Sequence, residues 1–270
     1  MALSVSVPKR HPLINALVTK RDVMNAVILR DMRTRFFGHG LGFLVVPLWP
    51  FVHMSILIII HSVTGRVPPY GDSTPVFFAT GLIPTLLFVY VSRFMVFSLM
   101  QNRPMLAFPV VQVSDIVMGR AFLEIIAAFA TLLLVLVVLW AMGQNPFPND
   151  MEWAVCGYLS TLWLAFGVGY CVGIMSMFFP MIVTAYNLTV IIIYITSGSL
   201  FVASDLPGSF SYYLSFNPVL ECVEWMRSAF YENYSDKLVS PLYILSFATI
   251  SLLLGLSLER GFRRTMLEGK

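Results

Sequence analysis

The most constraining feature of this sequence is the placement of its charges around long apolar runs. Of 17 Lys and Arg residues, seven lie in the first 35 positions and four in the last 11, and the region between them is mostly apolar. Basic ends, with acidic links between apolar runs, are typical of a membrane protein whose two ends lie in the cytoplasm.

The composition excludes an ordinary soluble domain. Hydrophobic residues make up 58% and charged residues 11% of the chain, whereas an average soluble domain is about 45–50% apolar and about 25% charged. Lipid must therefore be the solvent for much of this surface. We expect residues 1–270 to form one all-α transmembrane domain, because a backbone in lipid has to satisfy its own polar groups.

A transmembrane helix needs about 20 mainly apolar residues, and six runs of this kind are present. The predicted spans are 41–64, 75–100, 117–142, 152–178, 182–203 and 238–258. Six spans return the chain to the side on which it began. The charges agree, because Arg103 and Arg120 add to the cytoplasmic side, whereas the opposite side carries only Arg66, Arg227 and Lys237.

Two segments outside the spans are predicted to lie at the membrane surfaces. In residues 13–37, one helical face is apolar although Lys20 and Asp31 interrupt it, which predicts a cytoplasmic interfacial helix. A plain basic flank is the alternative. The apolar positions of that face are Leu17, Met24, Val27 and Ile28. Residues 204–236 are too polar to span the membrane but rich in aromatics, so we expect short outer interfacial helices that dip back into it.

No pattern for catalysis, nucleotide binding or metal binding is visible. The chain has no Gly-rich phosphate loop ending in Gly-Lys-Ser/Thr and no His-Glu-x-x-His sequence, and its three cysteines form no motif. We therefore expect no catalytic residues, cofactor or metal in this chain, so active transport would need an outside energy source. A small-residue series in the fourth span predicts close helix packing instead: Gly167, Gly169 and Gly173.

Two charges fall inside predicted spans, Arg93 in the second and Glu124 in the third. A charge at mid-membrane costs about 2.5–3.5 kcal/mol on insertion scales, so such residues usually face a partner or water. One interpretation is an Arg93–Glu124 pair that holds two helices together. The other is that Arg93 faces an anionic substrate in a transport pathway.

Aromatic and polar residues on the first two spans are candidates for that pathway. Trp49 lies one turn before His53, and Tyr90, Phe94 and Phe97 form an i, i+4, i+7 stripe. Aromatic rings with polar tips suit stacking against sugars in a wet conduit. Ordinary helix packing is the alternative for all five.

The cytoplasmic link 101–116 is short and amphipathic, with a helix cap expected at Ser114 or Asp115. It either docks in a groove on a soluble motor subunit or is a plain connector. Its candidate coupling residues are Arg103, Pro104, Phe108, Pro109, Ser114 and Asp115.

Three stretches, in this order and at these spacings, resemble the membrane subunit of type-2 ABC exporters in the capsular polysaccharide branch. They are LRDMRTRFFGHGLGFLVVPLWP, NRPMLAFPVVQVSDIVMGRAFLE and FNPVLECVEWMRSAFY. The resemblance implies a homodimer of six-span permeases in the bacterial inner membrane, bound to two copies of a cytoplasmic ATPase that holds ATP and Mg. It implies that 101–116 is the coupling element and that Arg93, Trp49 and the second-span aromatics lie near the conduit.

By the same resemblance, the cargo is a lipid-linked acidic polysaccharide, with periplasmic and outer-membrane export proteins as further partners and no role for nucleic acid. The same scaffold exporting O-antigen, teichoic acid or a small drug remains an alternative. A membrane-embedded enzyme acting on lipid is a second, but it would need clustered Asp, Glu or His. A channel that works without ATP is the third.

Overall fold

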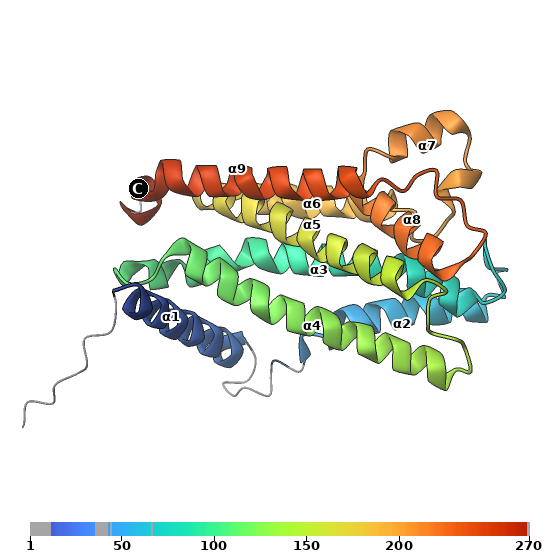
Figure 1. The fold of residues 1–270 in the computed structure, drawn as a ribbon, viewed down its shortest axis with the longest axis horizontal. Helices are drawn as coiled ribbons and strands as arrows, with labels where there is room; N and C mark the ends of the chain where they lie inside the picture. Colours follow the sequence, from blue (N-terminus) through green and yellow to red (C-terminus); the bar gives the residue numbers. More distant parts are fainter. Residues whose placement is uncertain (1–11, 36–42, 44, 66, 269–270) are drawn as a thin grey trace, which may run out of the picture.

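The chain folds as a bundle of helices that lie side by side along its long axis, with no strand in the described part (Figure 1). The computed structural model describes residues 12–35, 43, 45–65 and 67–268. The helices are α1 (Pro12–Arg35), α2 (Leu48–Val63), α3 (Thr74–Asn102), η2 (Arg103–Ala107), α4 (Val113–Ala141), α5 (Met151–Phe178), α6 (Met181–Ile195), η3 (Ala203–Asp205), α7 (Gly208–Leu214), α8 (Pro218–Phe230) and α9 (Pro241–Glu268).

Four of the six predicted spans form helices that are long and apolar enough to cross a membrane. These helices cover Thr74–Ala107, Val113–Ala141, Met151–Phe178 and Pro241–Phe262. The other two predicted spans, 41–64 and 182–203, correspond to the shorter apolar helices α2 and α6. Residues 41, 42 and 44 of the first predicted span lie outside the described part of the chain.

The two shorter helices are limited by local backbone signals that the hydropathy pattern does not contain. Helix α2 begins directly after Pro47. Helix α6 begins after Pro180 and ends at Ile195, three residues before Gly198, which has φ +72°. That left-handed conformation suits glycine and is common just after the end of a helix. Residues 196–202 therefore follow α6 as turns and not as helix.

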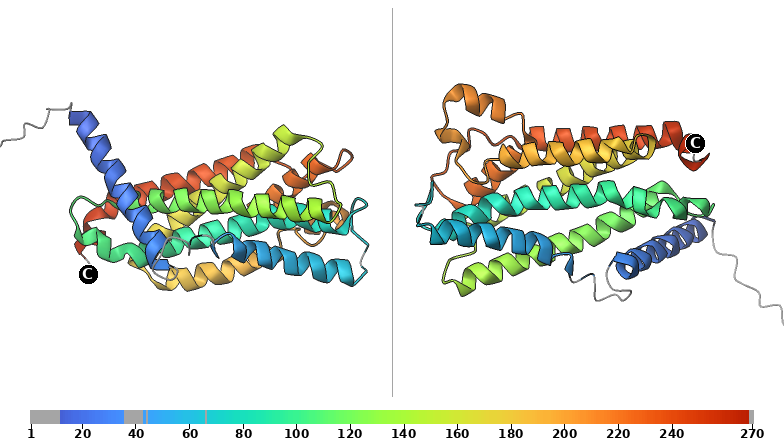
Figure 2. Two further views of the ribbon diagram at one scale, coloured as in Figure 1. Left: turned by 90° about the horizontal axis from the view of Figure 1, so that it is seen from below. Right: turned by 180° about the vertical axis from the view of Figure 1, so that it is seen from behind.

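The bundle has two distinct ends (Figures 1 and 2). At one end α1 begins, α9 ends and α3 passes into α4, and we call this the α1 end. At the other lie α7, α8 and the links α2–α3 and α4–α5, and we call this the α8 end. Helix α1 packs against α4 and crosses it obliquely, so it does not run along the long axis of the bundle. Residues 204–236 form η3, α7 and α8, the short helices that their composition predicts.

The centre of the bundle consists of α3 and α5, with α9 packed on the far side of α5. Helix α3 is the most enclosed of the long helices, and α4 is far more exposed. The predicted small-residue series makes this packing possible. A methyl group at Gly169 would lie 2.7 Å from Cβ of Met95 on α3, and one at Gly167 would overlap the carbonyl oxygen of Ala248 on α9.

Helix α8 is buried at its end of the bundle around one arginine. The Arg227 guanidinium donates to the carbonyl oxygens of Phe201 (2.7 Å) and Ser199 (3.0 Å), and its carbon lies 4.1 Å above the Phe77 ring. A carboxyl oxygen of Glu224 lies 3.7 Å from Nη1 of Arg227. These contacts tie the segment after α6 to α3 and α8.

Two carboxyls of α8 are also enclosed. The hydroxyl of Tyr234 donates to the carboxyl of Glu224 at 3.0 Å, and the backbone N–H of Ser240 donates to Glu221 at 3.2 Å. Burial raises the pKa of the Glu221 carboxyl to about 7 and also raises the pKa of Glu224. Desolvation disfavours the charged form of a carboxyl, and the hydrogen bonds from Tyr234 and Ser240 offset part of this cost.

The close approach at Gly167 generates a prediction about stability. Gly167→Ala should lower the free energy of unfolding by about 1–3 kcal/mol, because overpacking at a rigid backbone contact forces helices apart. Gly173→Ala is the matched control on the same helix, since its added methyl would meet Leu99 at an ordinary 3.4 Å. The stability of each variant is measured as the midpoint temperature of thermal aggregation in detergent. Equal midpoints would contradict the packing role of Gly167.

Candidate functional site

Four of the predicted pathway residues line one cavity on the side of α3. Tyr90, Arg93, Phe94 and Phe97 surround a space of about 350 Å³ together with Asn187 of α6. Their spacing of three and four residues places them on one helical face, as the sequence pattern indicates. We call this cavity, defined by these five residues, the α3 groove.

Arg93 is the cation of the α3 groove, and it is only partly used by the protein. One terminal nitrogen donates to the backbone carbonyl of Asn187 at 3.3 Å, which joins α3 to α6. Its Nε is buried and has no hydrogen-bond partner within the described residues. A guanidinium has five N–H donors, so Arg93 keeps donor capacity for an anionic group that enters the groove.

Of the two predicted pathway residues on α2, His53 lies next to the α3 groove and Trp49 does not line it. His53 Nδ1 lies 3.3 Å from the Tyr90 hydroxyl, and its ring centroid is 6.0 Å from that of Tyr194 on α6. His53 thus adjoins the groove through Tyr90. Trp49 is 57% exposed on the surface of α2 and is not part of the groove lining, so its pathway role stays a prediction.

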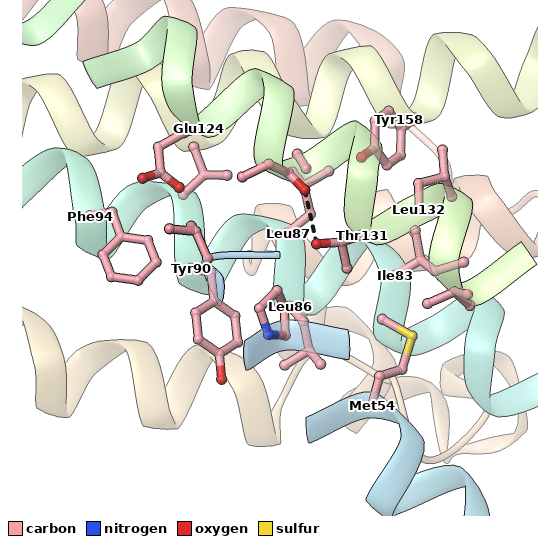
Figure 3. Close-up of a pocket in the computed structure, with 16 residues that line it drawn as sticks. Met54, Ile83, Leu86, Leu87, Tyr90, Phe94, Glu124, Thr131, Leu132 and Tyr158 are labelled. Carbon is pink, nitrogen blue, oxygen red and sulfur yellow. Dashed lines mark hydrogen bonds between the residues drawn. The ribbon is translucent and has the colours of Figure 1, made fainter. Parts of the chain in front are cut away.

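A second, smaller pocket of about 30 Å³ lies between α2, α3 and α4 beside the α3 groove (Figure 3). Tyr90 and Phe94 line both spaces, and Glu124 and Thr131 are its polar members on α4. The volume matches about one water molecule. The pocket therefore offers no room for a substrate.

The partners of the two intramembrane charges differ from the predicted Arg93–Glu124 pair. The Glu124 carboxylate accepts a hydrogen bond from Arg120, one helical turn earlier on α4, and both side chains are buried. Arg120 also lies 3.7 Å from Asp31 of α1, and its guanidinium carbon lies 5.1 Å from the centre of the Phe94 ring. Arg120 therefore connects α1, α4 and the lining of the α3 groove.

This cluster explains why the apolar stripe of α1 is interrupted. Asp31 reaches Arg120, and Lys20 lies 3.4 Å from Asp115 at the start of α4. Between them Val27 is fully buried at Gly119, where an added methyl would lie 3.3 Å from the Val27 side chain. The two charges that interrupt the stripe therefore face α4, where ion pairs hold α1 in place.

The predicted coupling segment projects from the α1 end of the bundle. Four of its six candidate coupling residues are exposed, namely Arg103, Pro104, Phe108 and Pro109. The Phe108 side chain is 63% exposed. The expected cap at Ser114 or Asp115 is wrong in position, because α4 begins at Val113 with Gln112 as its N-cap. Asp115 still supports the cap, since its carboxylate accepts the Gln112 N–H at 3.0 Å.

Sequence reasoning missed Arg120 and Asn187 as members of this region. Arg120 and Glu124 are four residues apart, a spacing that places two side chains on one helical face, so their pairing had a visible signal. Asn187 contributes only its backbone carbonyl to Arg93, which no residue pattern indicates. Among the described residues, no three His, Cys, Asp or Glu side chains gather to hold a metal ion.

No protein-family model matches the chain, but several known proteins are similar to it in sequence over most of its length. It is 29% identical over 249 residues to the polysialic acid transport protein KpsM of Escherichia coli, covering 92% of this chain and 96% of that protein. It is 25% identical over 253 residues to the capsule polysaccharide export inner-membrane protein CtrC of Neisseria meningitidis serogroup B, covering 92% and 94%.

A further relative exports a different polymer. The O-antigen export system permease protein RfbA of Klebsiella pneumoniae is 24% identical over 215 residues, covering 77% of this chain and 80% of that protein. KpsM and CtrC each match 92% of this chain, and RfbA matches 77% of it. The chain is thus similar over most of its length to a polysialic acid transport protein and to capsule polysaccharide export inner-membrane proteins.

Proposed function

We propose that this chain is the membrane-spanning permease subunit of an ATP-driven exporter that moves a lipid-linked capsular polysaccharide across the bacterial inner membrane. The observation that carries this proposal is the match to capsule export proteins over more than nine-tenths of the chain. A partly unused arginine in an aromatic-lined groove supports an acidic sugar polymer as the cargo.

In this proposal the six apolar helices cross the membrane and both termini lie in the cytoplasm. Helices α2 and α6 contain 16 and 15 residues, so each is about 22–24 Å long at 1.5 Å per residue. The hydrocarbon core is about 30 Å thick, and the turns that flank these helices complete the crossing. The basic residues at both chain ends and the common position of α1 and the end of α9 support this orientation.

The energy comes from a separate subunit. Two copies of a cytoplasmic ATPase bind ATP and Mg and contact the α1 end of a homodimer of this chain. The exposed Phe108 and its neighbouring prolines form the tip that docks in the ATPase. The Lys20–Asp115 and Asp31–Arg120 contacts join α1 to α4, so a push on the link moves both helices together.

The motion of the link biases the permease between closed and open states. Arg120 lies over Phe94, so a displacement at the start of α4 reaches the lining of the α3 groove. ATP favours one state by binding to the partner, which is a population shift rather than a direct contact with the cargo. Arg93 binds anionic groups of the polymer, and Tyr90, Phe94 and Phe97 stack on its sugar rings. Periplasmic and outer-membrane proteins then receive it.

O-antigen export is the second candidate, and the match to an O-antigen permease favours it. The scaffold, the coupling tip and the energy source would be unchanged, and only the polymer and its lipid anchor would differ. Expression of the chain with its ATPase in strains that lack either the capsule permease or the O-antigen permease separates the two. We expect surface capsule to return, and restoration of O-antigen alone would contradict the proposal.

The exposed tip predicts a separation of folding from coupling. Phe108→Asp should reduce export to about a tenth or less, because a buried aromatic anchor at an interface contributes at least about 2 kcal/mol. Membrane abundance should not change, since Phe108 is exposed in the isolated chain. Surface polymer and co-purification with the ATPase are measured together. Phe147→Asp, at an exposed position of the α4–α5 link, is the control and should keep both export and ATPase binding. If Phe108→Asp lost export but still co-purified with the ATPase, the docking role would be contradicted.

The cation of the α3 groove predicts a dependence on charge. Arg93→Gln should lower export of an acidic polymer about ten-fold, because a charge-assisted hydrogen bond contributes about 1.5–3 kcal/mol. Arg93→Lys keeps the charge and should retain more export. Surface polymer is measured relative to the amount of permease in the membrane. A parallel fall in export and abundance would assign Arg93 to helix packing.

The proposed topology is tested with reporters. Green fluorescent protein fused after Lys270 should fluoresce, because it folds in the cytoplasm. Alkaline phosphatase inserted in the α4–α5 link after Gly143 should be active, since that enzyme requires the oxidising periplasm. Reversed activities would show that the chain crosses the membrane in the opposite sense.

A further inference from the structure

A long apolar groove runs between α4 and α5, on a different face of α3 from the α3 groove. Its half nearest the α1 end has a volume of about 420 Å³ and a floor that includes Met95 of α3. Phe122 of α4 and Trp163 of α5 form its walls, and Met24 of α1 closes its end. We call this half the α4–α5 groove.

The space continues towards the α8 end. A second cavity of about 270 Å³ shares Phe129 and Leu159 with the first and ends against Phe147 and Phe230. The rings of Phe129 and Tyr158 lie 5.4 Å apart between the two halves. The gap exists because α4 packs closely on α3 but makes little contact with α5. The two cavities thus form one channel-like depression along the helices.

The lining decides what can occupy this space. Every residue that lines the α4–α5 groove is apolar, and the one N–H among them, Trp163 Nε1, is already bonded to the Thr249 hydroxyl at 3.1 Å. Water needs two to four polar partners in a buried site, so water is not a stable occupant. Both walls belong to helices that are long and apolar enough to span a membrane, so we expect lipid hydrocarbon to be the medium that meets them.

The walls also argue against a second copy of the chain. Helix pairs in membranes meet through small residues that let the backbones approach. Here the rim is bulky and partly exposed: Phe122 is 51% exposed, Phe129 is 41% exposed and Trp163 is 38% exposed. A concave slot between large side chains fits a thin, flexible chain better than a helix.

The mouth of the groove is basic. Met24 lies on α1, which carries five Lys or Arg residues and two Asp residues. The side chains of Lys20 and Arg21, about one turn before Met24, are 49% and 70% exposed. Basic residues at a membrane surface attract anionic lipid headgroups. The exposed ion pair of Arg21 with Asp22 is too weak to prevent an exchange of partner. Lys20 also lies 3.4 Å from Asp115, but an ammonium group has three N–H donors and can contact a phosphate at the same time.

We propose that the α4–α5 groove holds one acyl chain of an anionic phospholipid, whose phosphate lies against Lys20 and Arg21 of α1. The lipid is a resident of the membrane and not the exported cargo. It fills the space that α4 and α5 leave open and links the position of α1 to the leaflet at the α1 end. This site depends only on the membrane location of the chain, and it would stand even if the exported polymer were different.

Native mass spectrometry of the full-length protein tests the site. The protein is purified from cells that make no capsule or O-antigen polymer and is titrated with phosphatidylglycerol or phosphatidylcholine of identical acyl chains. We expect tighter retention of phosphatidylglycerol by the wild type. Ala121→Trp, which fills the groove, should abolish that retention, whereas Leu133→Trp, on the exposed face of α4, should keep it.

A second pair of variants tests the contact between the lipid headgroup and α1. Arg21→Gln should weaken phosphatidylglycerol retention about five-fold, and Arg33→Gln, the same change farther along α1, should not. Equal retention by the two tryptophan variants, or equal retention of the two lipids by the wild type, would overturn the proposal. So would a lipid that is bound only when the polymer is made, or a dimer that Ala121→Trp dissociates.

A second measurement does not depend on the folding of Ala121→Trp. Trp163 is retained as the sole tryptophan after the other four are changed to Phe, and the protein is placed in bilayers whose phosphatidylglycerol is brominated on the acyl chain. We expect strong quenching of Trp163 fluorescence, and weaker quenching when the bromine is on phosphatidylcholine at the same fraction. Absence of quenching in both bilayers would show that the groove is closed to lipid.

Discussion

The structure depends on the close approach of α5 to the helices on either side of it. In a membrane, burial of apolar side chains does not drive helices together, because lipid tails are as apolar as Leu, so backbone proximity and packing must do so. Gly169 allows contact with α3, and Gly167 and Gly255 allow contact between α5 and α9. The result is a tightly packed centre of α3, α5 and α9, around which α2, α4 and α6 are held by fewer contacts.

Buried arginines organise the two ends of this bundle in different ways. At the α8 end, Arg227 donates to two backbone carbonyls and closes the turn after α6 over α3. At the α1 end, Arg120 pairs with carboxylates from two helices and lies over Phe94. A buried charge that loses its partner is costly, so both sites specify one arrangement of their helices. Arg93 lies between these ends, where it lines the α3 groove, is half-buried and donates to the backbone carbonyl of Asn187.

This arrangement separates the parts of a permease in space. The exposed Phe108 tip lies at the α1 end, the Arg120 cluster connects it to α1 and α4, and Phe94 belongs both to that cluster and to the α3 groove. The α4–α5 groove lies on another face of α3, against the same α1 helix. Helix α4 makes little contact with α5, and it adjoins both the segment that carries Phe108 and the α4–α5 groove.

The structure differs from the sequence-based expectations in where helices begin and end and in which partner a charge has. Hydropathy extends the fifth predicted span through residue 203, whereas helix α6 ends at Ile195 and is followed by a turn that contains the left-handed Gly198. Ser114 and Asp115 have good capping side chains, but the chain enters α4 at Gln112. Glu124 has a cation on its own helix one turn away, and that local pairing with Arg120 is geometrically easier than one across to another helix.

The sequence by itself determined that this chain is an integral membrane protein, that it is helical and that its basic residues gather at its two ends. These properties follow from local composition, which acts on each segment separately. Only the tertiary structure decided that Lys20 and Asp31 face α4, that Asn187 meets Arg93 and that α4 and α5 leave a groove between them. Those outcomes depend on how each helix is rotated and tilted against its neighbours, which is set by packing between residues far apart in the chain.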